Sequence, residues 1–233
     1  MITSLKFLKS RFLRRSLLLP ELDVAALARE IFYQGLLDNA ARGLSVALPP
    51  LYPVKGAANW SLLYGLFRLA TESGVKSVLE LGAGQSTILL NALADQRLKV
   101  TTVETDPDWA AFVRQRVKTE VVLMQMTDRE VHGRNISAYE GLDSLRDVYD
   151  CIVVDAPVGT KRYSRWASLE ILDRCLGDEF VAVFDDAERR GEQDTIKAFL
   201  QTSKGRRAQL NFVRGAKHQC YLYTQRYAAV AYF

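Results

Sequence analysis

Apolar residues recur every three or four positions along the first third of the chain, and they form short uninterrupted runs along much of the rest. The first pattern is typical of amphipathic helices and the second of buried strands. The helical spacing predicts helices over residues 1–18, 22–43 and 59–73. Pro20 separates the first two helices, and the proline- and glycine-rich stretch 47–59 predicts a loop ahead of the third.

From residue 76 onward, predicted strands and helices alternate along the chain. This alternation predicts a parallel sheet with helices on both faces, and ligands bind such sheets beyond the carboxyl ends of the strands. The polar segment 127–148 shows no clear periodicity and receives no assignment. Strands are expected at residues 76–81, 99–104, 120–126, 150–156 and 179–186, with helices between them at 87–94, 106–117, 164–176 and 188–203.

Two late apolar runs, 208–213 and 219–224, are joined by a turn too short for a parallel crossover, so they predict an antiparallel hairpin. Residues 227–233 are expected to form a further strand or an irregular tail. The predicted fold is a doubly wound, Rossmann-like α/β sheet of about seven strands, mostly parallel, with this C-terminal hairpin and with N-terminal helices. Residues 1–58 are expected to form a helical extension and loop, and residues 59–233 the main domain.

The composition is that of an ordinary globular protein, with 233 residues, 48% of them hydrophobic, and a net charge of +4. The basic residues are concentrated at the start of the chain, and the remainder is close to neutral, so no nucleic-acid partner is expected. The basic, apolar-striped N-terminal helix could contact an anionic membrane, its own domain or a partner subunit. The five basic residues that no acid accompanies are Lys6, Lys9, Arg11, Arg14 and Arg15.

The three cysteines, Cys151, Cys175 and Cys220, lie far apart in apolar surroundings and form no CxxC pair. We therefore expect reduced, buried thiols rather than disulfides or a zinc site. No apolar run reaches the length of a membrane span or of a secretory signal. The expected location is cytoplasmic, with membrane association left open, and the oligomeric state is not predicted.

A glycine-rich turn follows the first predicted strand and opens a helix. Gly82 and Gly84 let the backbone approach a ligand closely, and free amide groups at the helix start are expected to face that ligand. Glu104 ends the second predicted strand, where an acid can accept both hydroxyls of a ribose. Glu80 stands just before the glycines, where a carboxylate opposes a pyrophosphate but suits a ligand with an ammonium group and a sulfonium centre.

These features favour S-adenosylmethionine as the ligand. The dinucleotide fingerprint GxGxxG is incomplete, because Thr87 stands at its third glycine position. An NAD(P)-type dinucleotide-binding oxidoreductase stays open as one alternative. A non-catalytic binding or scaffold protein that kept the fold is the other.

The stretch ELGAGQST, residues 80–87, followed by VTTVETDPDW, residues 100–109, resembles motif I and the next acidic strand of class I S-adenosylmethionine-dependent methyltransferases. The resemblance runs from about residue 75 to about residue 225 and implies that 59–233 is a methyltransferase domain. It implies glycines around the methionine moiety and an acid on the ribose, and it offers no clear match for the adenine contact. The implied cofactor-binding residues are Glu80, Gly82, Ala83, Gly84, Ser86, Thr87, Glu104 and Thr105.

Carboxylates follow the fourth and fifth predicted strands, at Asp155, Asp185 and Asp186. Adjacent strands would bring the three to one rim of the sheet. Three interpretations of them stay open. They could cap helices and hold loops; Asp155 could act as a general base toward an acceptor hydroxyl; or all three could bind a divalent cation. The layout is similar to that of metal-dependent catechol-type O-methyltransferases, although Asp186 stands where that family has asparagine.

The stretch DAPVG, residues 155–159, resembles the DAPxG element of glucuronoxylan-type polysaccharide methyltransferases. Arginines flank this rim and can bind carboxylate or phosphate in bidentate fashion, although a solvated face of Arg–Asp pairs is an equal alternative. No Asn-Pro-Pro-Tyr-type motif follows the fourth strand, which argues against methylation of exocyclic amines or nucleobases. The predicted function is methyl transfer to a small-molecule or saccharide-like acceptor, preferably at oxygen. The expected acceptor-binding residues are Arg162, Arg165, Asp186 and Arg189.

Overall fold

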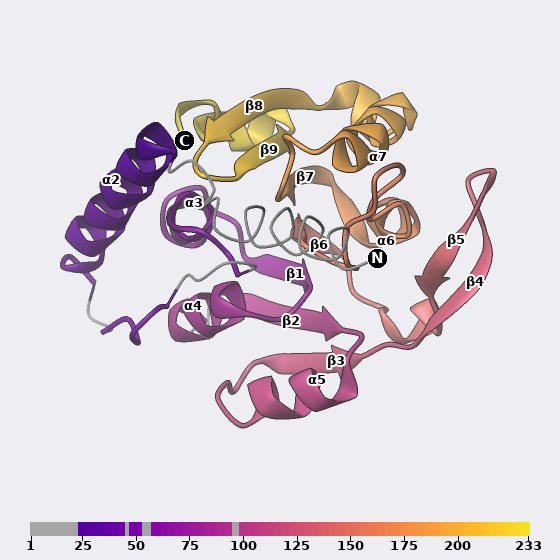
Figure 1. The fold of residues 1–233 in the computed structure, drawn as a ribbon, viewed down its shortest axis with the longest axis horizontal. Helices are drawn as coiled ribbons and strands as arrows, with labels where there is room; N and C mark the ends of the chain where they lie inside the picture. Colours follow the sequence, from indigo (N-terminus) through magenta and orange to yellow (C-terminus); the bar gives the residue numbers. More distant parts are fainter. Residues whose placement is uncertain (1–22, 45–46, 53–56, 95–97) are drawn as a thin grey trace, which may run out of the picture.

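The computed structural model describes residues 23–44, 47–52, 57–94 and 98–233 (Figure 1). The helix predicted at residues 1–18 lies outside them. The second predicted helix is confirmed as α2 (Val24–Ala41), which begins after Asp23, whose side chain accepts a hydrogen bond from the amide of Ala26. The third is confirmed as α3 (Trp60–Thr71). Among the described residues, no helix combines the length and the apolar character needed to cross a membrane.

A seven-stranded sheet forms the centre of the fold, in the order β3-β2-β1-β6-β7-β9-β8. The first five strands in this order are mutually parallel, and β9 pairs antiparallel with both β7 and β8, which confirms the predicted hairpin. The chain order reverses between β1 and β6, so the switch point lies beyond their carboxyl ends. The strands are β1 (Ser77–Leu81), β2 (Lys99–Glu104), β3 (Glu120–Leu123), β6 (Tyr149–Val154), β7 (Leu176–Phe184), β8 (Gln209–Arg214) and β9 (His218–Tyr223).

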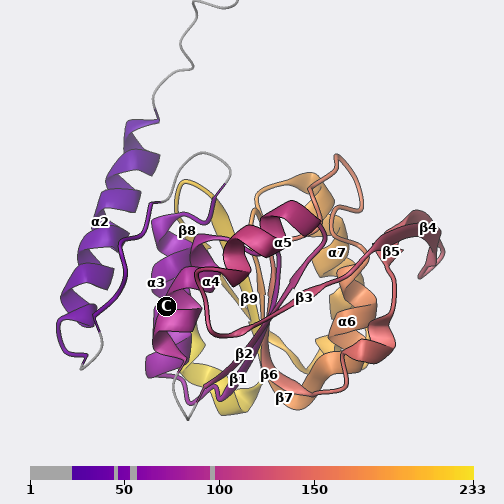
Figure 2. The same cartoon turned by 90° about the horizontal axis from the view of Figure 1, so that it is seen from below.

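Helices cover both faces of the sheet (Figure 2). α3 and α4 (Gln85–Leu93) pack on one face, and the right-handed crossover through α5 (Pro107–Arg114) places that helix on the same side. α6 (Ser168–Cys175) and α7 (Arg190–Gln201) pack on the other face. Successive side chains of a strand point to opposite faces of the sheet, and the helices on each face bury them. Val78 therefore lies in one apolar cluster and Leu79 in the other, which explains why the strands are apolar throughout.

A separate two-stranded ribbon, β4 (Met126–Val131) and β5 (Arg134–Tyr139), projects from the body in the segment that the sequence pattern left unassigned (Figure 1). His132 and Gly133 form its two-residue turn, both with positive φ, as a tight hairpin turn requires. Most ribbon side chains are polar and at least partly exposed, with only three buried. Such a strand pair has no clean alternation of apolar and polar residues, and this explains why the periodicity did not predict it.

Other boundaries differ from the predictions at their ends. The third strand stops at Leu123 rather than at residue 126, and α6 begins at Ser168 because the preceding residues form turns. The tail is neither a strand nor irregular: Gln225–Tyr232 forms two 3₁₀ segments joined at a kink at Tyr227, and Tyr227 and Val230 are buried against the sheet. All three cysteines are free and buried, as predicted.

Candidate functional site

The glycine turn after β1 is closed against the protein on one side and open on the other. Gly82 has φ +98°, and a Cβ built there would come within 2.9 Å of the Ala156 Cβ after β6. Only glycine satisfies both the backbone conformation and this close approach. Gly84 has an extended backbone, and a Cβ there would meet no atom within 4 Å. The free space for a ligand therefore lies over Gly84.

The three amide groups of the turn itself, which precede the start of α4 at Gln85, are already bonded within the protein. The Gly82 amide donates to the Val103 carbonyl at 2.8 Å. The Ala83 amide donates to Glu104 Oε2 at 3.0 Å. The Gly84 amide donates to Thr87 Oγ1 at 2.8 Å. Because pyrophosphate recognition depends on free amide donors at such a turn, these three amides do not provide a phosphate cradle.

Glu80 lies fully buried beneath the turn with one carboxylate oxygen unpartnered. Its Oε2 accepts hydrogen bonds from Thr87 Oγ1 at 2.6 Å and from Thr102 Oγ1 at 2.8 Å. Its Oε1 has no hydrogen-bond partner within the protein. Burial raises the pKa of Glu80 to about 7, against the opposing effect of hydroxyl donors that include Ser86 and Thr87. A cationic group arriving above the turn would supply the favourable interaction that this carboxylate lacks.

Glu104 ties the glycine turn to the end of β2. Its Oε1 accepts from the amides of Thr105 at 2.6 Å and Asp106 at 2.9 Å, while Oε2 accepts from Ala83. A carboxylate has about four acceptor positions, so roughly one position remains for a ligand hydroxyl. Glu104 can therefore accept one ligand hydroxyl as it stands, and accepting two would require one backbone bond to be exchanged.

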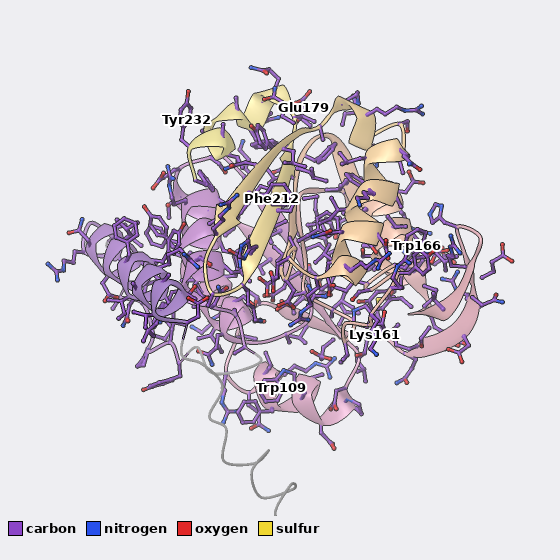
Figure 3. All side chains as sticks on the ribbon, turned by 45° about the horizontal axis from the view of Figure 1, so that its top comes forward. Trp109, Lys161, Trp166, Glu179, Phe212 and Tyr232 are labelled. Carbon is purple, nitrogen blue, oxygen red and sulfur yellow. The ribbon has the colours of Figure 1, made fainter. Side chains whose placement is uncertain are left out.

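Trp109, which the sequence analysis did not select, lies beside the same turn on α5 (Figure 3). Its indole Nε1 donates to the Ala83 carbonyl at 2.8 Å, and its ring stacks on Phe112 with centroids 4.9 Å apart. The only feature of the sequence that could have identified Trp109 is its position shortly after Glu104, at the end of the second predicted strand. A cavity of about 420 Å³ opens here; it is lined by Pro49, Pro50, Tyr52, Gly84, Gln85, Ile88, Trp109, Phe112, Val113 and Arg116.

The second group of predicted residues gathers around the guanidinium of Arg165, whose side chain is only 4% exposed. Nη2 donates to Asp155 Oδ1 at 2.9 Å and to Asp186 Oδ2 at 2.6 Å. Nη1 donates to the backbone carbonyls of Val154 and Asp185 at 3.1 and 2.9 Å. Arg165 thus holds the ends of β6 and β7 together, and neither it nor the buried Asp186 is placed to contact an acceptor as the sequence predicted.

The backbone around this cluster is held in an uncommon conformation. Tyr163, Arg165 and Asp186 all have positive φ, between 54° and 57°. Residues other than glycine enter this region at a cost, and they stay there only where the surroundings over-determine it. Here the ion pairs of Arg165 with Asp155 and Asp186 hold the backbone in this conformation. The cluster therefore fixes the conformation of this part of the rim.

The three carboxylates do not fit a divalent cation, although their oxygens lie within 4.8 Å of one another. Arg165 already pairs with two of them, and Lys217 Nζ lies 3.3 Å from Asp185 Oδ2 and 3.6 Å from Asp186 Oδ1. Two cations of the protein therefore already compensate the charge of these carboxylates, and an added metal ion would have to compete with both. This pairing argues against a metal ion at Asp155, Asp185 and Asp186.

Asp155 remains the accessible carboxylate of the group, with 21% of its side chain exposed. Burial, followed by the negative charge of Asp185, raises the pKa of Asp155 to about 7, while Arg165 and Lys217 oppose the rise. Burial alone would lower the pKa of Lys217, but the carboxylates of Asp185, Asp186 and Asp155 outweigh it and raise that pKa. The site therefore combines a titratable carboxylate with a protonated amine.

Lys217 is the second site residue that the sequence analysis missed. It belongs to the turn between β8 and β9, and its ammonium group also donates to the Ala57 carbonyl at 3.1 Å. Because β9 runs antiparallel to β7, this turn lies at the carboxyl edge of the parallel strands. The predicted hairpin could have indicated that location, but the contact with Asp185 depends on tertiary packing.

The remaining predicted arginines lie on the outer rim. Arg162 is exposed and binds Asp194 through Nε at 2.6 Å, which corresponds to the alternative of a solvated Arg–Asp face. Arg189 is also exposed and reaches Asp186 Oδ2 at 2.9 Å. Lys161 projects from the loop after β6 that also carries Arg162 (Figure 3). This rim is therefore lined with cations that solvent can reach.

Comparison with known proteins places the fold. No family model and no curated protein matches the sequence. Among solved structures, a methyltransferase from Geobacter sulfurreducens is 17% identical, covers 93% of this chain and 96% of its own, and has a TM-score of 0.50. A precorrin-6y C5,15-methyltransferase from Geobacter metallireducens is 16% identical, covers 75% and 94%, and has a TM-score of 0.50. The chain therefore has the Rossmann-like fold of class I methyltransferases.

Proposed function

We propose that this chain, which folds as class I methyltransferases do, transfers a methyl group from S-adenosylmethionine to an oxygen of a small or saccharide-like acceptor. The observation that carries the donor is the glycine turn. Its three amides are satisfied internally, and Glu80 and Glu104 flank it with carboxylates. Such a turn disfavours a pyrophosphate and suits a ligand that carries an ammonium group and a ribose.

The residues around the turn fit this donor. Glu80 is linked to Gly84 through Thr87 Oγ1, and its unpartnered Oε1 favours the ammonium of the methionine moiety. Glu104 is placed for the ribose, and Thr105 follows it at the same strand end. When bound, S-adenosylmethionine supplies a methyl group already activated by its sulfonium sulfur. The protein's main contribution is therefore to place the acceptor oxygen in line with that group and to accept its proton.

Asp155 is the group that we assign to the proton. Its Oδ1 is held by Arg165, which leaves Oδ2 to accept the proton of an acceptor hydroxyl. A carboxyl group with a pKa of about 7 is matched to this role near neutral pH. As the oxygen–methyl bond forms, the carbon–sulfur electron pair passes to sulfur, and the hydroxyl proton passes to Asp155. The nearby ammonium of Lys217 orients the acceptor oxygen and stabilises its developing negative charge.

The acceptor class follows from the rim. Arg189, which pairs with Asp186, and Lys161, on the loop after β6, are exposed cations, so an acceptor with a hydroxyl and a carboxylate or phosphate group suits the site best. An acidic or nucleotide-linked sugar has this chemistry. Arg165 acts in this scheme as a positioning residue, because it orients Asp155 and is too buried to reach a ligand.

Calorimetry with S-adenosylhomocysteine, NAD⁺ and NADP⁺ tests the donor. We expect the wild type to bind S-adenosylhomocysteine and neither dinucleotide. A Glu80→Gln variant should bind S-adenosylhomocysteine about tenfold more weakly or worse, because the ligand's ammonium group loses a charged partner. Glu72→Gln, on the exposed end of α3, serves as the matched control and should bind normally. Binding of NAD⁺ without S-adenosylhomocysteine would instead support an oxidoreductase, and binding of none of the three would support a non-catalytic protein.

The acceptor is found by incubating the enzyme with labelled donor and a panel of sugars, sugar acids, nucleotide sugars and phenols. Transfer to an anionic, hydroxyl-bearing compound is the expected outcome. Transfer only to amines or to carbon would contradict the assignment to oxygen. The product's mass and the position of its label identify the methylated atom.

A further inference from the structure

A chain of buried polar side chains connects α2 to the rim around Asp155. It begins at Glu30 on α2, a residue that is only 9% exposed. Glu30 Oε1 accepts hydrogen bonds from the Ala216 amide at 2.7 Å and from Asn59 Nδ2 at 2.9 Å, and Oε2 accepts from the Trp60 amide at 2.6 Å. Burying a carboxylate is costly unless hydrogen bonds compensate it. Here the compensating donors come from two distant segments, so Glu30 joins α2, the start of α3 and the β8–β9 turn.

The turn that carries Lys217 rests directly on Glu30. A Cβ built at Gly215 would lie 2.5 Å from Glu30 Oε1 and would also collide with Ser61, so only glycine lets the backbone come this close. The next amide of the turn, that of Ala216, donates to the same oxygen. The Gly215 amide donates to the Lys217 carbonyl at 3.0 Å and closes the turn. Glu30 therefore fixes the backbone that leads into Lys217.

Glu30 also fixes the segment that receives the Lys217 side chain. The ammonium group of Lys217 donates to the Ala57 carbonyl at 3.1 Å, and Ala57 lies three residues before Trp60, whose amide is bonded to Glu30. One buried carboxylate thus holds both the turn backbone and the segment to which the ammonium group binds. With both in place, Lys217 Nζ lies 3.3 Å from Asp185 Oδ2.

The Asp185 carboxylate is held independently by Gln219, a fully buried residue of β9. Gln219 Nε2 donates to Asp185 Oδ1 at 2.8 Å and to Asn59 Oδ1 at 3.1 Å, and its Oε1 accepts from Ser61 Oγ at 2.8 Å. Gln219 therefore holds one oxygen of Asp185 while Lys217 pairs with the other. Because Asp185 has this second anchor, a displaced turn would separate the ion pair instead of moving it as a unit.

We propose that Glu30 is a positioning residue of the methyl-transfer site, which holds the Lys217 ammonium against Asp185 from a helix outside the sheet. The role in turnover rests on the proposed function, whereas the placement of Lys217 does not. Glu30 lies too deep to contact an acceptor and acts through Lys217. On this proposal α2, which belongs to the segment 1–58 that we expected to form an extension, contributes to the site.

The charges around Asp155 give the inference a measurable consequence. Burial and the charges of Asp185 and Asp186 raise the pKa of Asp155, whereas Arg165 and Lys217 oppose the rise. These groups face Asp155 from the loop after β6, the end of β7 and the β8–β9 turn. An ammonium group that is no longer held in place stabilises the ionised carboxylate less, so the pKa of Asp155 should move upward.

A double-mutant cycle between Glu30 and Lys217 tests the inference. Glu30→Gln keeps the side-chain shape, but one of its two acceptor oxygens becomes a donor and cannot accept. With an acceptor from the panel, this variant should lower kcat about tenfold and leave the KM for S-adenosylmethionine unchanged. In a Lys217→Met background the same substitution should have no further effect, because Glu30 acts through Lys217. Asp38→Asn, at an exposed carboxylate of the same helix, is the matched control and should turn over as the wild type does.

Carbon-13 NMR titration of the aspartate carboxylates reads the same cycle without turnover, with Asp155 assigned by its loss in Asp155→Asn. We expect the Asp155 midpoint to rise in Glu30→Gln and in Lys217→Met, and to rise no further in the double variant than in Lys217→Met. Gly215→Ala disturbs the same contact from the turn and should give the same rise, so either folded variant decides the question.

Two results would overturn the inference. One is a Glu30→Gln effect on kcat or on the midpoint that is equally large with and without Lys217, as an independent structural role would give. The other is a midpoint that Lys217→Met raises while Glu30→Gln and Gly215→Ala leave it unchanged. Absence of methyl transfer by the wild type would refute the proposed function alone, because the titration would still decide whether Glu30 positions Lys217.

Discussion

Replacing Arg165 with methionine tests whether the buried ion-pair cluster holds the site together. The substitution keeps most of the side-chain volume but removes four hydrogen bonds, two of them to the carboxylates of Asp155 and Asp186. Removing one partner of a buried ion pair costs about 3–5 kcal/mol, because the remaining charge is left without compensation. For a chain of 233 residues this corresponds to a fall in melting temperature of roughly 6–20 °C.

The loss should depend on pH, and the direction follows from the carboxylates. The pKa of Asp155 is already raised to about 7, and loss of the guanidinium raises it further. A carboxyl group whose pKa is raised on folding destabilises the protein when ionised, so the penalty is complete above its folded pKa and disappears as it becomes protonated. The difference in unfolding free energy between wild type and Arg165→Met is therefore largest above the raised pKa of Asp155 in the variant, and it is expected to narrow as the pH falls from that value to about 7, where Asp155 of the wild type also becomes protonated.

Urea unfolding followed by tryptophan fluorescence at pH values on both sides of this range measures the effect. Arg162→Met, three residues away on the same loop, is the control: its guanidinium is exposed and its pair with Asp194 is screened by solvent, so it should unfold as the wild type does. Arg165→Lys retains the charge and should recover part of the loss. Equal stability of Arg165→Met and Arg162→Met, or a difference that does not change with pH, would refute the role assigned to the cluster.

Three further outcomes are expected. Gly82→Ala should lose about 1–3 kcal/mol of unfolding free energy because of the positive φ at this position, and the contact with Ala156 adds further strain. Gly35→Ala, in the open middle of α2, should instead gain about 0.5–1 kcal/mol. Chemical denaturation measures both variants, and equal effects would contradict the close-approach argument. With an acceptor from the panel, the methyl-transfer rate should rise as pH passes through about 7, and Asp155→Asn should lower kcat about 10²- to 10⁴-fold and abolish that rise; a variant with the wild-type pH profile would exclude Asp155 as the base. Chelation should leave S-adenosylhomocysteine affinity and turnover unchanged, and electron paramagnetic resonance should detect no bound Mn²⁺; a stoichiometric bound signal would show that the fixed cations do not replace a metal.

The local pattern of the sequence was enough to predict the sheet and the glycine turn that follows its first strand. Runs of apolar residues locate strands because a strand covered on both faces has no polar side, and each of the seven main strands coincides with a predicted run. The turn between Glu80 and Thr87 could likewise be read directly, since glycine and carboxylate positions next to a strand end are local features. The ribbon β4–β5 escaped prediction because its polar residues carry no periodic signal.

What the sequence by itself determined is therefore the order of elements, the sheet and the identity of the residues at its carboxyl edge. Only the tertiary structure decided which of these residues pair with one another. It used the amides of the glycine turn internally, placed the Arg165 guanidinium among the carboxylates and brought Lys217 to them from a distant hairpin. The physical reason is that hydrophobic periodicity depends on neighbours along the chain, whereas hydrogen bonds and ion pairs depend on strand order and burial, which bring together groups dozens of residues apart.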